Sequence, residues 1–528
     1  MPTVSLNKKE FEKLVGKKLD LDKLKDRISY LGTDLERIEG NEIIVEIFPN
    51  RPDMLSEQGL ARAFSSFIGV KTGLRKYKVK KSGHKVIVDK SVTMRPYTAC
   101  AIVKNIKFDD EKIKQIMQIQ EKLALSHGRN RKKSAYGLYP SRGINFPMHY
   151  IAKDPKAVKF KPLGFDKEMI ASKVEQIHPK GKEYRWVAEG WEKYPFFIDS
   201  KDNVMCMLPY TNSEDTGKID ENTKEVFIEC TGVDLQNINI ALNIFVTMLA
   251  DMGGEIYSMD IVYSGKTITT PDLKPKKMKL NIKAMNKWLG LDLSEKEVKG
   301  YLERMGYDYN GDVFVPAYRA DILHEVDLYE DIAIAYGYEN FKEEIPNIST
   351  IGEEDKFAIF KGKIARFLVG FGLLEVNNYH LGSEGVIEVE GGSSEYGFLR
   401  NWLVPGMLKN LRDNKSYDYP QKIFEIGTIF KKGESETGVI ENDRLGLLVS
   451  HGDAGFTEVK QILDSLLSYL GFDYKIEECT HDSFIEGRCG RVIVNGKNVA
   501  YIGELHPKVL EGLGMPVAGF ELNLSEIF

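Results

Sequence analysis

The chain has 528 residues, 42% of them hydrophobic, so it can bury several cores, and its length predicts about three or four domains. A net charge of -5 and a pI near 6.1 exclude a wholly basic protein that coats nucleic acid, although they allow local basic patches. Five cysteines without CxxC spacing argue against a zinc ribbon or a disulfide framework, and no stretch approaches the roughly eighteen apolar residues of a membrane span. With no apolar leader at its start, the sequence predicts a cytoplasmic protein without a membrane partner.

The first 88 residues predict a small N-terminal domain. Helical patterns at 7–16 and 20–32 precede an alternating strand at 41–48, and Ser56 is placed to cap the next helix. Residues 71–90 are polar and basic. We interpret them as a solvated linker that runs into an edge strand, with a nucleic-acid contact as the less favoured alternative.

Residues 89–272 intermingle strands and helices, which is typical of an α+β domain. The predicted strands lie at 98–106, 194–200, 203–209 and 225–232, and the predicted helices at 109–128 and 237–254. Residues 273–345 form a smaller unit of helices and a short hairpin, in which Ser294 is placed as a helix cap. Residues 346–528 begin with a long helix and end in strands, so the whole chain is predicted to be an α+β multidomain protein.

The stretch ADILHEVDLYEDIAIAYGY, residues 320–338, is unusually acidic. Asp321 is placed as an N-cap, and helical spacing puts Asp327, Glu330 and Asp331 together on one face. A neighbouring face carries the predicted buried stripe: Ile322, Val326, Tyr329, Ala333 and Tyr336. Three like charges so close together are either neutralised by Lys or Arg, exposed to water, or bound to a hard cation, Mg²⁺ before Ca²⁺. Periodicity leaves these alternatives open.

A resemblance bears on that choice. VPAYRADILHEVDLYEDIAIAYGY resembles the B5-domain signature of the phenylalanyl-tRNA synthetase beta subunits. EIFPNRPDMLSEQGLARAF resembles the N-terminal domain of that family, QEKLALSHGRNRKKSAYGLYPS and MLPYTNSEDTGKIDENTKEVFIECTGVD its B3/B4 domain, and FLRNWLVPGMLKNLRDNKSYDYPQKIFEIGTIF its C-terminal domain. The resemblance is to the shorter archaeal and eukaryotic type, and it follows the family order along nearly the whole chain.

The resemblance implies a B1-like domain at 1–88, a B3/B4-like editing domain at 89–272, a B5-like helical or winged domain at 273–345, and a class II synthetase-like antiparallel sheet domain at 346–528. It also implies a Mg²⁺ site at the contact with the alpha subunit. The four implied metal ligands are Asp321, Asp327, Glu330 and Asp331.

Activation of an amino acid with ATP requires groups that stabilise phosphate charge. The sequence has no P-loop, no Rossmann fingerprint and no HIGH- or KMSKS-type signal. Its end, EGLGMPVAGFELNLSEIF, resembles the third class II motif in glycine spacing but lacks the arginine after it. The resemblance therefore implies that an alpha subunit binds ATP and phenylalanine, in an α2β2 enzyme that acts on tRNA(Phe).

A pocket built for phenylalanine rejects the added hydroxyl of tyrosine by only about a hundredfold, so a second, hydrolytic site is useful. The family's B3/B4 domain hydrolyses tyrosyl-tRNA. Glu229 is a candidate acceptor for the tyrosine hydroxyl, and Thr231 lies on the same strand face. Further pocket residues implied by the resemblance are Asn212, Ser213, Glu214, Cys206 and Phe197. No Ser/His/Asp or Cys/His set is visible, so we expect attack by water without a covalent intermediate.

The same residues also allow interpretations without an editing site in this subunit. Thr231 and Cys206 suit simple core packing, and the chain is then a structural subunit whose editing site has decayed; a free-standing hydrolase of mischarged tRNA is a further alternative. The loop residues Arg129, Arg131, Lys132 and Lys133 predict a phosphate contact for the tRNA end, with a solvated loop as the alternative.

Overall fold

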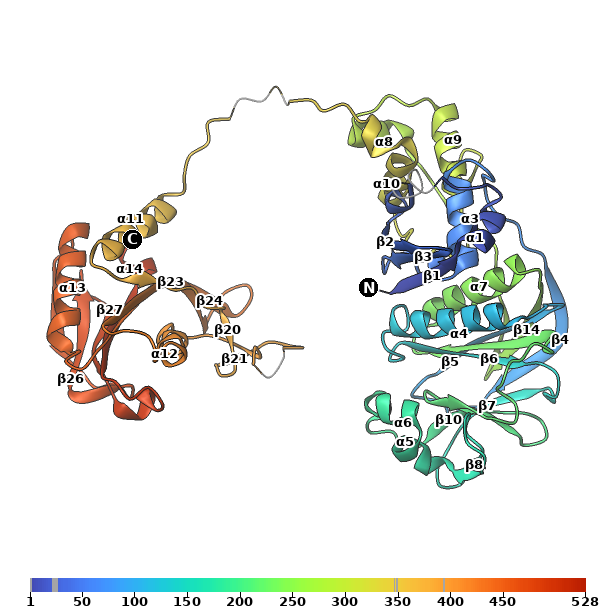
Figure 1. The fold of residues 1–528 in the computed structure, drawn as a ribbon, viewed down its shortest axis with the longest axis horizontal. Coiled ribbons are helices and arrows are strands. Elements are labelled where there is room, and N and C mark those ends of the chain that lie inside the picture. The colour runs from blue at the N-terminus through green and yellow to red at the C-terminus, as the bar shows by residue number, and fades with distance from the viewer. Residues whose placement is uncertain (1, 21–26, 346, 348–349, 393–394) are drawn as a thin grey trace. The chain divides into compact units, whose positions relative to one another are not determined.

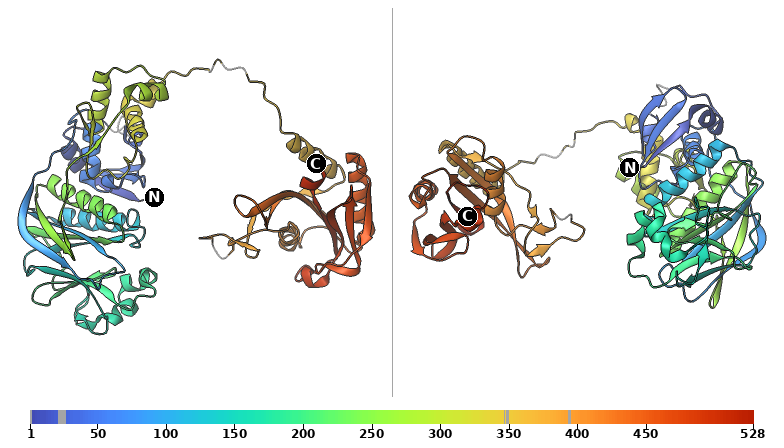
Figure 2. Two further views of the ribbon diagram at one scale, coloured as in Figure 1. Left: turned by 180° about the vertical axis from the view of Figure 1, so that it is seen from behind. Right: turned by 60° about the horizontal axis from the view of Figure 1, so that its bottom comes forward.

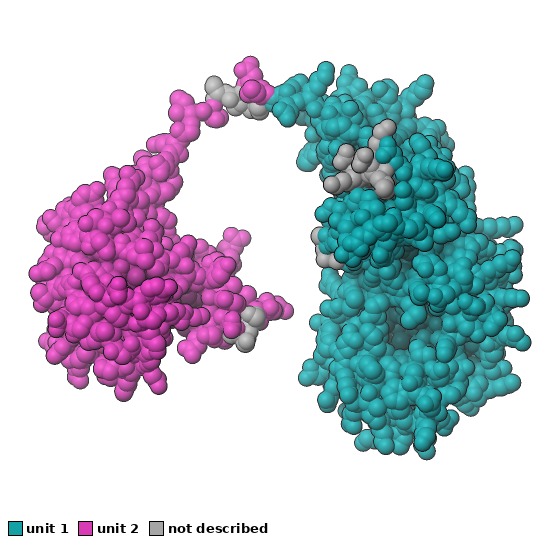
Figure 3. All heavy atoms as spheres, viewed as in Figure 1, with its two compact units in different colours: residues 1–344 teal, residues 345–528 magenta. Residues whose placement is uncertain are grey.

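The computed structural model describes residues 2–20, 27–345, 347, 350–392 and 395–528. They form two compact units, Met1–Glu344 and Ile345–Phe528, coloured teal and magenta in Figure 3. The helix predicted at 20–32 lies partly outside the described residues, and Arg27 to Tyr30 are helical. No helix formed by the described residues is both long enough and apolar enough to span a bilayer.

The first unit starts with a three-stranded sheet in the order β1-β3-β2. Its strands are Thr3–Asn7 (β1), Thr33–Glu39 (β2) and Glu42–Ile47 (β3), and the helices beside it are Lys8–Val15 (α1) and Glu57–Phe67 (α3). The predicted cap at Ser56 is confirmed, since its side chain accepts a hydrogen bond of 3.0 Å from the Gly59 N–H.

A mixed ten-stranded sheet follows, in the order β12-β11-β10-β7-β4-β14-β5-β13-β6, with β15 paired to β14. Its strands are Val79–Val88 (β4), Tyr97–Lys104 (β5), Ser134–Pro140 (β6), Met148–Lys153 (β7), Tyr194–Ile198 (β10), Val204–Met207 (β11), Thr211–Asn212 (β12), Glu225–Gly232 (β13), Glu255–Tyr263 (β14) and Lys266–Thr270 (β15). Short elements between them are Lys159–Phe160 (β8), Met169–Ile170 (β9), Val174–Ile177 (α5) and Pro179–Glu183 (α6).

Helices α4 (Asp110–Leu125) and α7 (Leu235–Asp251) lie side by side on one face of this sheet, as Figures 1 and 2 both show. Ile119 of α4 and Phe245 of α7 belong to one buried core with Ala101 of β5 and Ile228 of β13. The opposite face carries a second, aromatic core. There Phe197 of β10 lies 6.3 Å, centroid to centroid, from Phe227 of β13 although four strands separate them, so the sheet curls on itself.

The strand at 79–88 corrects two predictions. β4 is not an edge strand, because it pairs in parallel with β14 on one side and with β7 on the other. It also joins the sheet of the following residues rather than the N-terminal domain that was predicted to end at residue 88. The end of this strand, HKVIV, supplies Val86 to the aromatic core, and burial of that side chain outweighs the polar composition around it.

Residues 276–340 pack three helices against a small sheet in the order β16-β18-β17. The elements are Lys276–Met278 (β16), Ile282–Leu289 (α8), Glu295–Arg304 (α9), Asp308–Tyr309 (β17), Val313–Val315 (β18) and Glu325–Tyr336 (α10). The predicted cap at Ser294 is confirmed and forms a reciprocal capping box with Glu297.

The predicted start of the acidic helix is wrong. Its N-cap is His324, three residues after Asp321, which pairs with an arginine instead. The predicted buried stripe is also partly wrong: Val326 is 36% exposed, while Leu328 and Ile332 are fully buried. Ile322, Tyr329 and Ala333 are buried as predicted, so the buried face is displaced toward Leu328 and Ile332 rather than reversed.

The second unit is built on a seven-stranded sheet in the order β19-β23-β24-β28-β27-β26-β25, in which every pair is antiparallel except β19 with β23. Its strands are Leu374–Glu375 (β19), Gln421–Lys432 (β23), Val439–Ser450 (β24), Tyr474–Glu478 (β25), Phe484–Val494 (β26), Lys497–Leu505 (β27) and Val517–Asn523 (β28), and β20 (Leu381–Gly382), β21 (Ile387–Glu388) and β22 (Phe398–Leu399) form a small sheet. The helices are Lys356–Gly370 (α11), Val404–Asp413 (α12), Phe456–Leu470 (α13) and Leu524–Ile527 (α14). The α+β multidomain class and the mainly antiparallel last sheet are thus confirmed.

Candidate functional site

Glu229 is the only acidic side chain of β13 that the sheet buries completely. It lies between β5 and β6, directly opposite Cys100 and Gly137, and is 1% exposed. Its Oε1 lies 3.2 Å from the hydroxyl of Tyr139, within hydrogen-bond distance, whereas Oε2 has no hydrogen-bond partner among the described residues. A buried carboxyl oxygen left without a partner is costly, which marks this position as a candidate ligand site.

Burial raises the pKa of Glu229 to about 8, because the low-dielectric interior disfavours the charged form. The positive charge of Arg95 acts in the opposite direction but does not offset burial. The carboxyl is therefore mostly protonated at pH 7.

Three of the predicted pocket residues gather near Glu229. Phe197 and Cys206 are opposite each other on β10 and β11, and Cys206 is opposite Asn212 on β12. Asn212 reaches the site through Tyr139, whose hydroxyl lies 3.1 Å from Asn212 Oδ1. Thr231 lies two residues along β13 from Glu229, with its Oγ1 3.4 Å from the carbonyl oxygen of Ala135.

Ser213 and Glu214 do not join this group through their observed contacts. The Ser213 N–H donates to the carbonyl of Met205, and Glu214 accepts a 2.8 Å hydrogen bond from the Gly164 N–H in a separate loop. The continuity of TNSEDT in sequence predicted one cluster, but the chain turns away after Asn212.

Tyr139 and Arg95 are site residues that the sequence did not reveal. Arg95 is 1% exposed and donates to the carbonyl oxygens of Arg131 at 2.9 Å and Thr231 at 3.0 Å. Tyr139 shares the inward face of β6 with Gly137. The pairing of β6 with β13, which brings Tyr139 to Glu229, is a long-range contact that periodicity cannot predict.

The basic loop contributes fewer free cations than predicted. Arg131 donates to the carbonyls of Pro209 and Tyr210 and pairs with Glu121 at 3.3 Å, and Lys133 pairs with Asp234 at 3.0 Å. These two side chains hold the loop to its own domain. Arg129 and Lys132 are exposed.

The acidic stretch is organised around a buried cation of the chain itself. Arg319, with a side chain 2% exposed, donates to both carboxylate oxygens of Asp321 at 2.7 Å and to Asp331 at 2.8 Å. The Tyr307 hydroxyl also donates to Asp331. The pKa of Asp321 is lowered by the Arg319 charge against the effect of burial.

The other two predicted metal ligands are directed elsewhere. Asp327 Oδ2 accepts from the N–H groups of Leu323 and His324 at 2.7 Å each, and Glu330 accepts from the Tyr338 hydroxyl. Among the described residues, no group of three or more His, Cys, Asp or Glu side chains is arranged to hold a metal ion. The predicted Mg²⁺ site does not fit this arrangement, and neutralisation by an arginine, the alternative, accounts for two of the four carboxylates.

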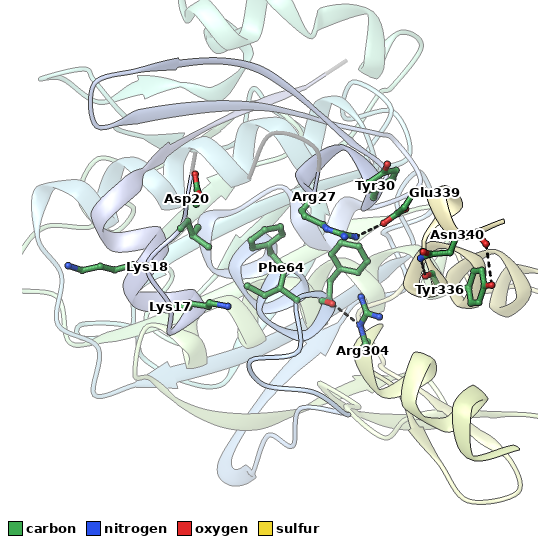
Figure 4. Close-up of a pocket in the computed structure, with 13 residues that line it drawn as sticks. Lys17, Lys18, Asp20, Arg27, Tyr30, Phe64, Arg304, Tyr336, Glu339 and Asn340 are labelled. Atoms are coloured by element: carbon green, nitrogen blue, oxygen red, sulfur yellow. Dashed lines mark hydrogen bonds and ion pairs between the residues drawn. The ribbon is translucent and has the colours of Figure 1, made fainter. Parts of the chain in front are cut away.

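A cavity of about 800 Å³ lies between the N-terminal helices and the helices of residues 282–340 (Figure 4). Its basic side chains are Lys17, Lys18, Arg27 and Arg304, and Phe64 and Phe67 contribute an apolar wall. Arg27 pairs with Glu339 at 3.1 Å. The sequence offered no signal for this cavity, because its walls come from segments nearly 300 residues apart.

Comparison with known proteins defines the class. Residues 278–338 match the family described as tRNA synthetase B5 domain, and residues 342–524 match the family described as phenylalanyl tRNA synthetase beta chain CLM domain. These are domains of an aminoacyl-tRNA synthetase subunit.

Full-length relatives give the particular family. The chain is 39% identical to the phenylalanine–tRNA ligase beta subunit of Thermococcus sibiricus, covering 100% of this chain and 99% of the relative. It is 38% identical to that of Pyrococcus abyssi, with both chains covered completely. The crystal structure of an N-terminal fragment of the Pyrococcus horikoshii beta subunit matches 64% of this chain and 100% of that chain, with a TM-score of 0.61 at 38% identity. The chain belongs to the family of phenylalanine–tRNA ligase beta subunits.

Proposed function

We propose that this chain is the beta subunit of an α2β2 phenylalanine–tRNA ligase of the cytoplasm and that residues 89–272 hydrolyse tyrosyl-tRNA(Phe) formed in error. The alpha subunit binds ATP and phenylalanine and catalyses activation. The full-length likeness to beta subunits supports the assembly, and the missing arginine after EGLGMPVAGF supports the division of labour.

The observation that carries the editing proposal is the free oxygen of Glu229. A tyrosyl hydroxyl can donate to Oε2, and a phenylalanyl side chain has no donor to offer. Sites built to hydrogen-bond a substrate hydroxyl discriminate strongly against the analogue that lacks it, because their polar group is then left unpaired. Glu229 thus supplies the discrimination that a hydrophobic pocket lacks.

The reaction is hydrolysis of an ester. Water attacks the carbonyl carbon of the tyrosyl ester, the bond between that carbon and the ribose oxygen breaks, and the ribose oxygen takes up a proton. Glu229 and Thr231 hold the amino acid while water attacks, so no bond to the protein forms. We further propose that the exposed Arg129 and Lys132 contact phosphates of the tRNA end, since cations that are not engaged internally are available for such contacts.

The test is deacylation of tyrosyl-tRNA(Phe) by the chain co-purified with its alpha subunit. The wild-type complex is expected to hydrolyse tyrosyl-tRNA faster than phenylalanyl-tRNA, and Glu229→Ala is expected to lose this activity. Glu214→Ala is the matched control, because Glu214 is the neighbouring acid that turns to Gly164. Equal activity of wild type and Glu229→Ala contradicts the assignment.

A structural subunit with a closed site is the second candidate. It is favoured by burial, since Phe197 and Cys206 are 0% exposed and Glu229 is 1% exposed. A wild-type complex that aminoacylates tRNA but hydrolyses no tyrosyl-tRNA is the outcome expected from this candidate.

A further inference from the structure

Tyr139 lies at the centre of a short chain of buried polar groups. Its side chain is fully buried, and its single hydroxyl lies 3.2 Å from Glu229 Oε1 and 3.1 Å from Asn212 Oδ1. A tyrosine hydroxyl has one proton to donate, so it cannot donate to both oxygens at once. One of the two contacts is satisfied only if the partner donates to Tyr139.

Two arrangements of the protons satisfy the hydrogen bonds among Glu229, Tyr139 and Asn212. In the first, a protonated Glu229 donates from Oε1 to Tyr139, and Tyr139 donates to Asn212. In the second, the amide of Asn212 is turned, its nitrogen donates to Tyr139, and Tyr139 donates to an ionised Glu229. The second arrangement leaves a buried carboxylate with one oxygen unpartnered, which costs far more than burying the neutral acid. The first arrangement is therefore favoured.

The groups that face Glu229 agree with this choice. Cys100 on β5, Cys206 on β11 and Tyr150 on β7 are neutral because burial raises the pKa of each. Arg95 is a cation whose charge acts on Glu229, and two of its nitrogens already donate to the carbonyls of Arg131 and Thr231.

We infer that Tyr139 is a positioning residue for specificity: it fixes Glu229 through Oε1 and leaves Oε2 as the acceptor for a phenolic hydroxyl. The inference rests on the proposed editing function and refines it. Oε1 is occupied by Tyr139, so only Oε2 is free for the substrate. Asn212 is the last of these hydrogen-bonded polar groups. It lies on β12, a two-residue strand at the sheet edge, and is half-buried.

Glutamine at position 229 distinguishes a neutral acid from a carboxylate. The amide nitrogen of Glu229→Gln can donate to Tyr139 while the amide oxygen accepts from the substrate, which reproduces the hydrogen bonds of the protonated acid at every pH. An ionised carboxylate has no such mimic, since glutamine carries no charge.

The experiment measures hydrolysis of tyrosyl- and phenylalanyl-tRNA(Phe) by the αβ complex between pH 6 and 9.5. After subtraction of the hydroxide-driven rate measured without protein, wild-type hydrolysis of tyrosyl-tRNA is expected to fall as the pH rises through about 8, because ionised Glu229 takes the Tyr139 proton away from Asn212 and disrupts the buried hydrogen bonds. Glu229→Gln is expected to rescue most of the activity lost in Glu229→Ala and to remove the pH dependence. Tyr139→Phe is expected to raise KM for tyrosyl-tRNA about tenfold, the value of one hydrogen bond, and to alter the pH profile.

Tyr136→Phe is the matched control. Tyr136 is on the same strand and is buried, but it faces the opposite core and its hydroxyl contacts Ser134 at 2.6 Å. Aminoacylation with phenylalanine and the melting temperature report whether each variant has folded.

The outcomes separate the inference from the proposed function. If Glu229→Gln is as inactive as Glu229→Ala, or if Tyr139→Phe matches wild type in KM and pH profile, the inference is wrong and the editing function stands. If the wild-type complex hydrolyses no tyrosyl-tRNA, both are wrong.

Discussion

Arg319 determines the electrostatics of the acidic stretch at the level of single residues. Replacing it by Met removes the cation that Asp321 and Asp331 share, and removal of one partner from a buried ion pair typically costs about 3–5 kcal/mol. We expect Arg319→Met to lower the free energy of unfolding of the first unit by about that amount, measured by urea denaturation. The exposed Lys287→Met is expected to change it by less than about 0.5 kcal/mol.

Two further measurements make this prediction specific. Combining Arg319→Met with Asp321→Asn and Asp331→Asn removes all three charges and is expected to recover much of the loss. A chelator is expected to leave the melting temperature of the wild-type chain unchanged. A lower melting temperature in the presence of chelator would instead indicate that these carboxylates bind a metal ion.

Glu229 makes stability depend on pH in a predictable direction. Its pKa in the folded chain is about 8, above the ordinary value of 4.5, so the folded state binds the proton more tightly than the unfolded state. Its contribution to the free energy of unfolding is therefore fully present below pH 4.5, decreases as the pH rises to about 8, and is absent above that. The difference amounts to at most about 5 kcal/mol.

Comparison of wild type with Glu229→Gln isolates this contribution, because Glu57 and Glu521, whose pKa values burial raises to about 7, titrate in both proteins. The variant is expected to gain stability relative to wild type between pH 5 and pH 9 in urea denaturation. A difference that does not change with pH contradicts a buried neutral acid.

Strand β4 is the element in which structure and sequence differ most. A proline can be tolerated in an edge strand, where some N–H groups face solvent. A central strand has a partner on both sides, so its N–H groups point toward one partner strand or the other. Ile87 is opposite Val262 on β14 and His149 on β7, so Ile87→Pro is expected to destabilise the first unit by about 3 kcal/mol or more.

Ile87→Ala keeps the backbone N–H and removes only part of a half-buried side chain, so it is the control for the proline variant. It is expected to cost clearly less in the same denaturation experiment. Equal losses for the two variants would mean that the hydrogen-bond ladder at this position is unimportant.

Features that depend on residues close together in the sequence were predicted, and features that depend on distant residues were missed. The caps at Ser56 and Ser294 depend on residues three positions away, and both were found. The central position of β4 depends on strands about 62 and 175 residues later in the chain, and it was missed. In the candidate site, Glu229 was proposed from a family motif, whereas its contact with Tyr139 becomes visible only when β6 and β13 are paired.

At the scale of the whole molecule, each unit contains complete cores of its own. The cores of the second unit are formed by residues such as Leu463 and Phe520 on one face of its sheet and Met407 and Leu448 on the other. The crystallised Pyrococcus horikoshii fragment, which matches 64% of this chain, shows that a relative's N-terminal part folds without the rest. Since each unit buries its own core, each is expected to unfold in its own transition.

Limited proteolysis tests this division. Residues 350–354 form no helix or strand and are exposed, so brief digestion of the beta chain is expected to cut near them before it cuts either unit. The fragments should be close to 352 and 176 residues, and Arg319→Met should speed further digestion of the larger one only. Cleavage first between residues 79 and 270 would contradict the independence of the units, because it would mean that the ten-stranded sheet opens before the segment that joins them is cut.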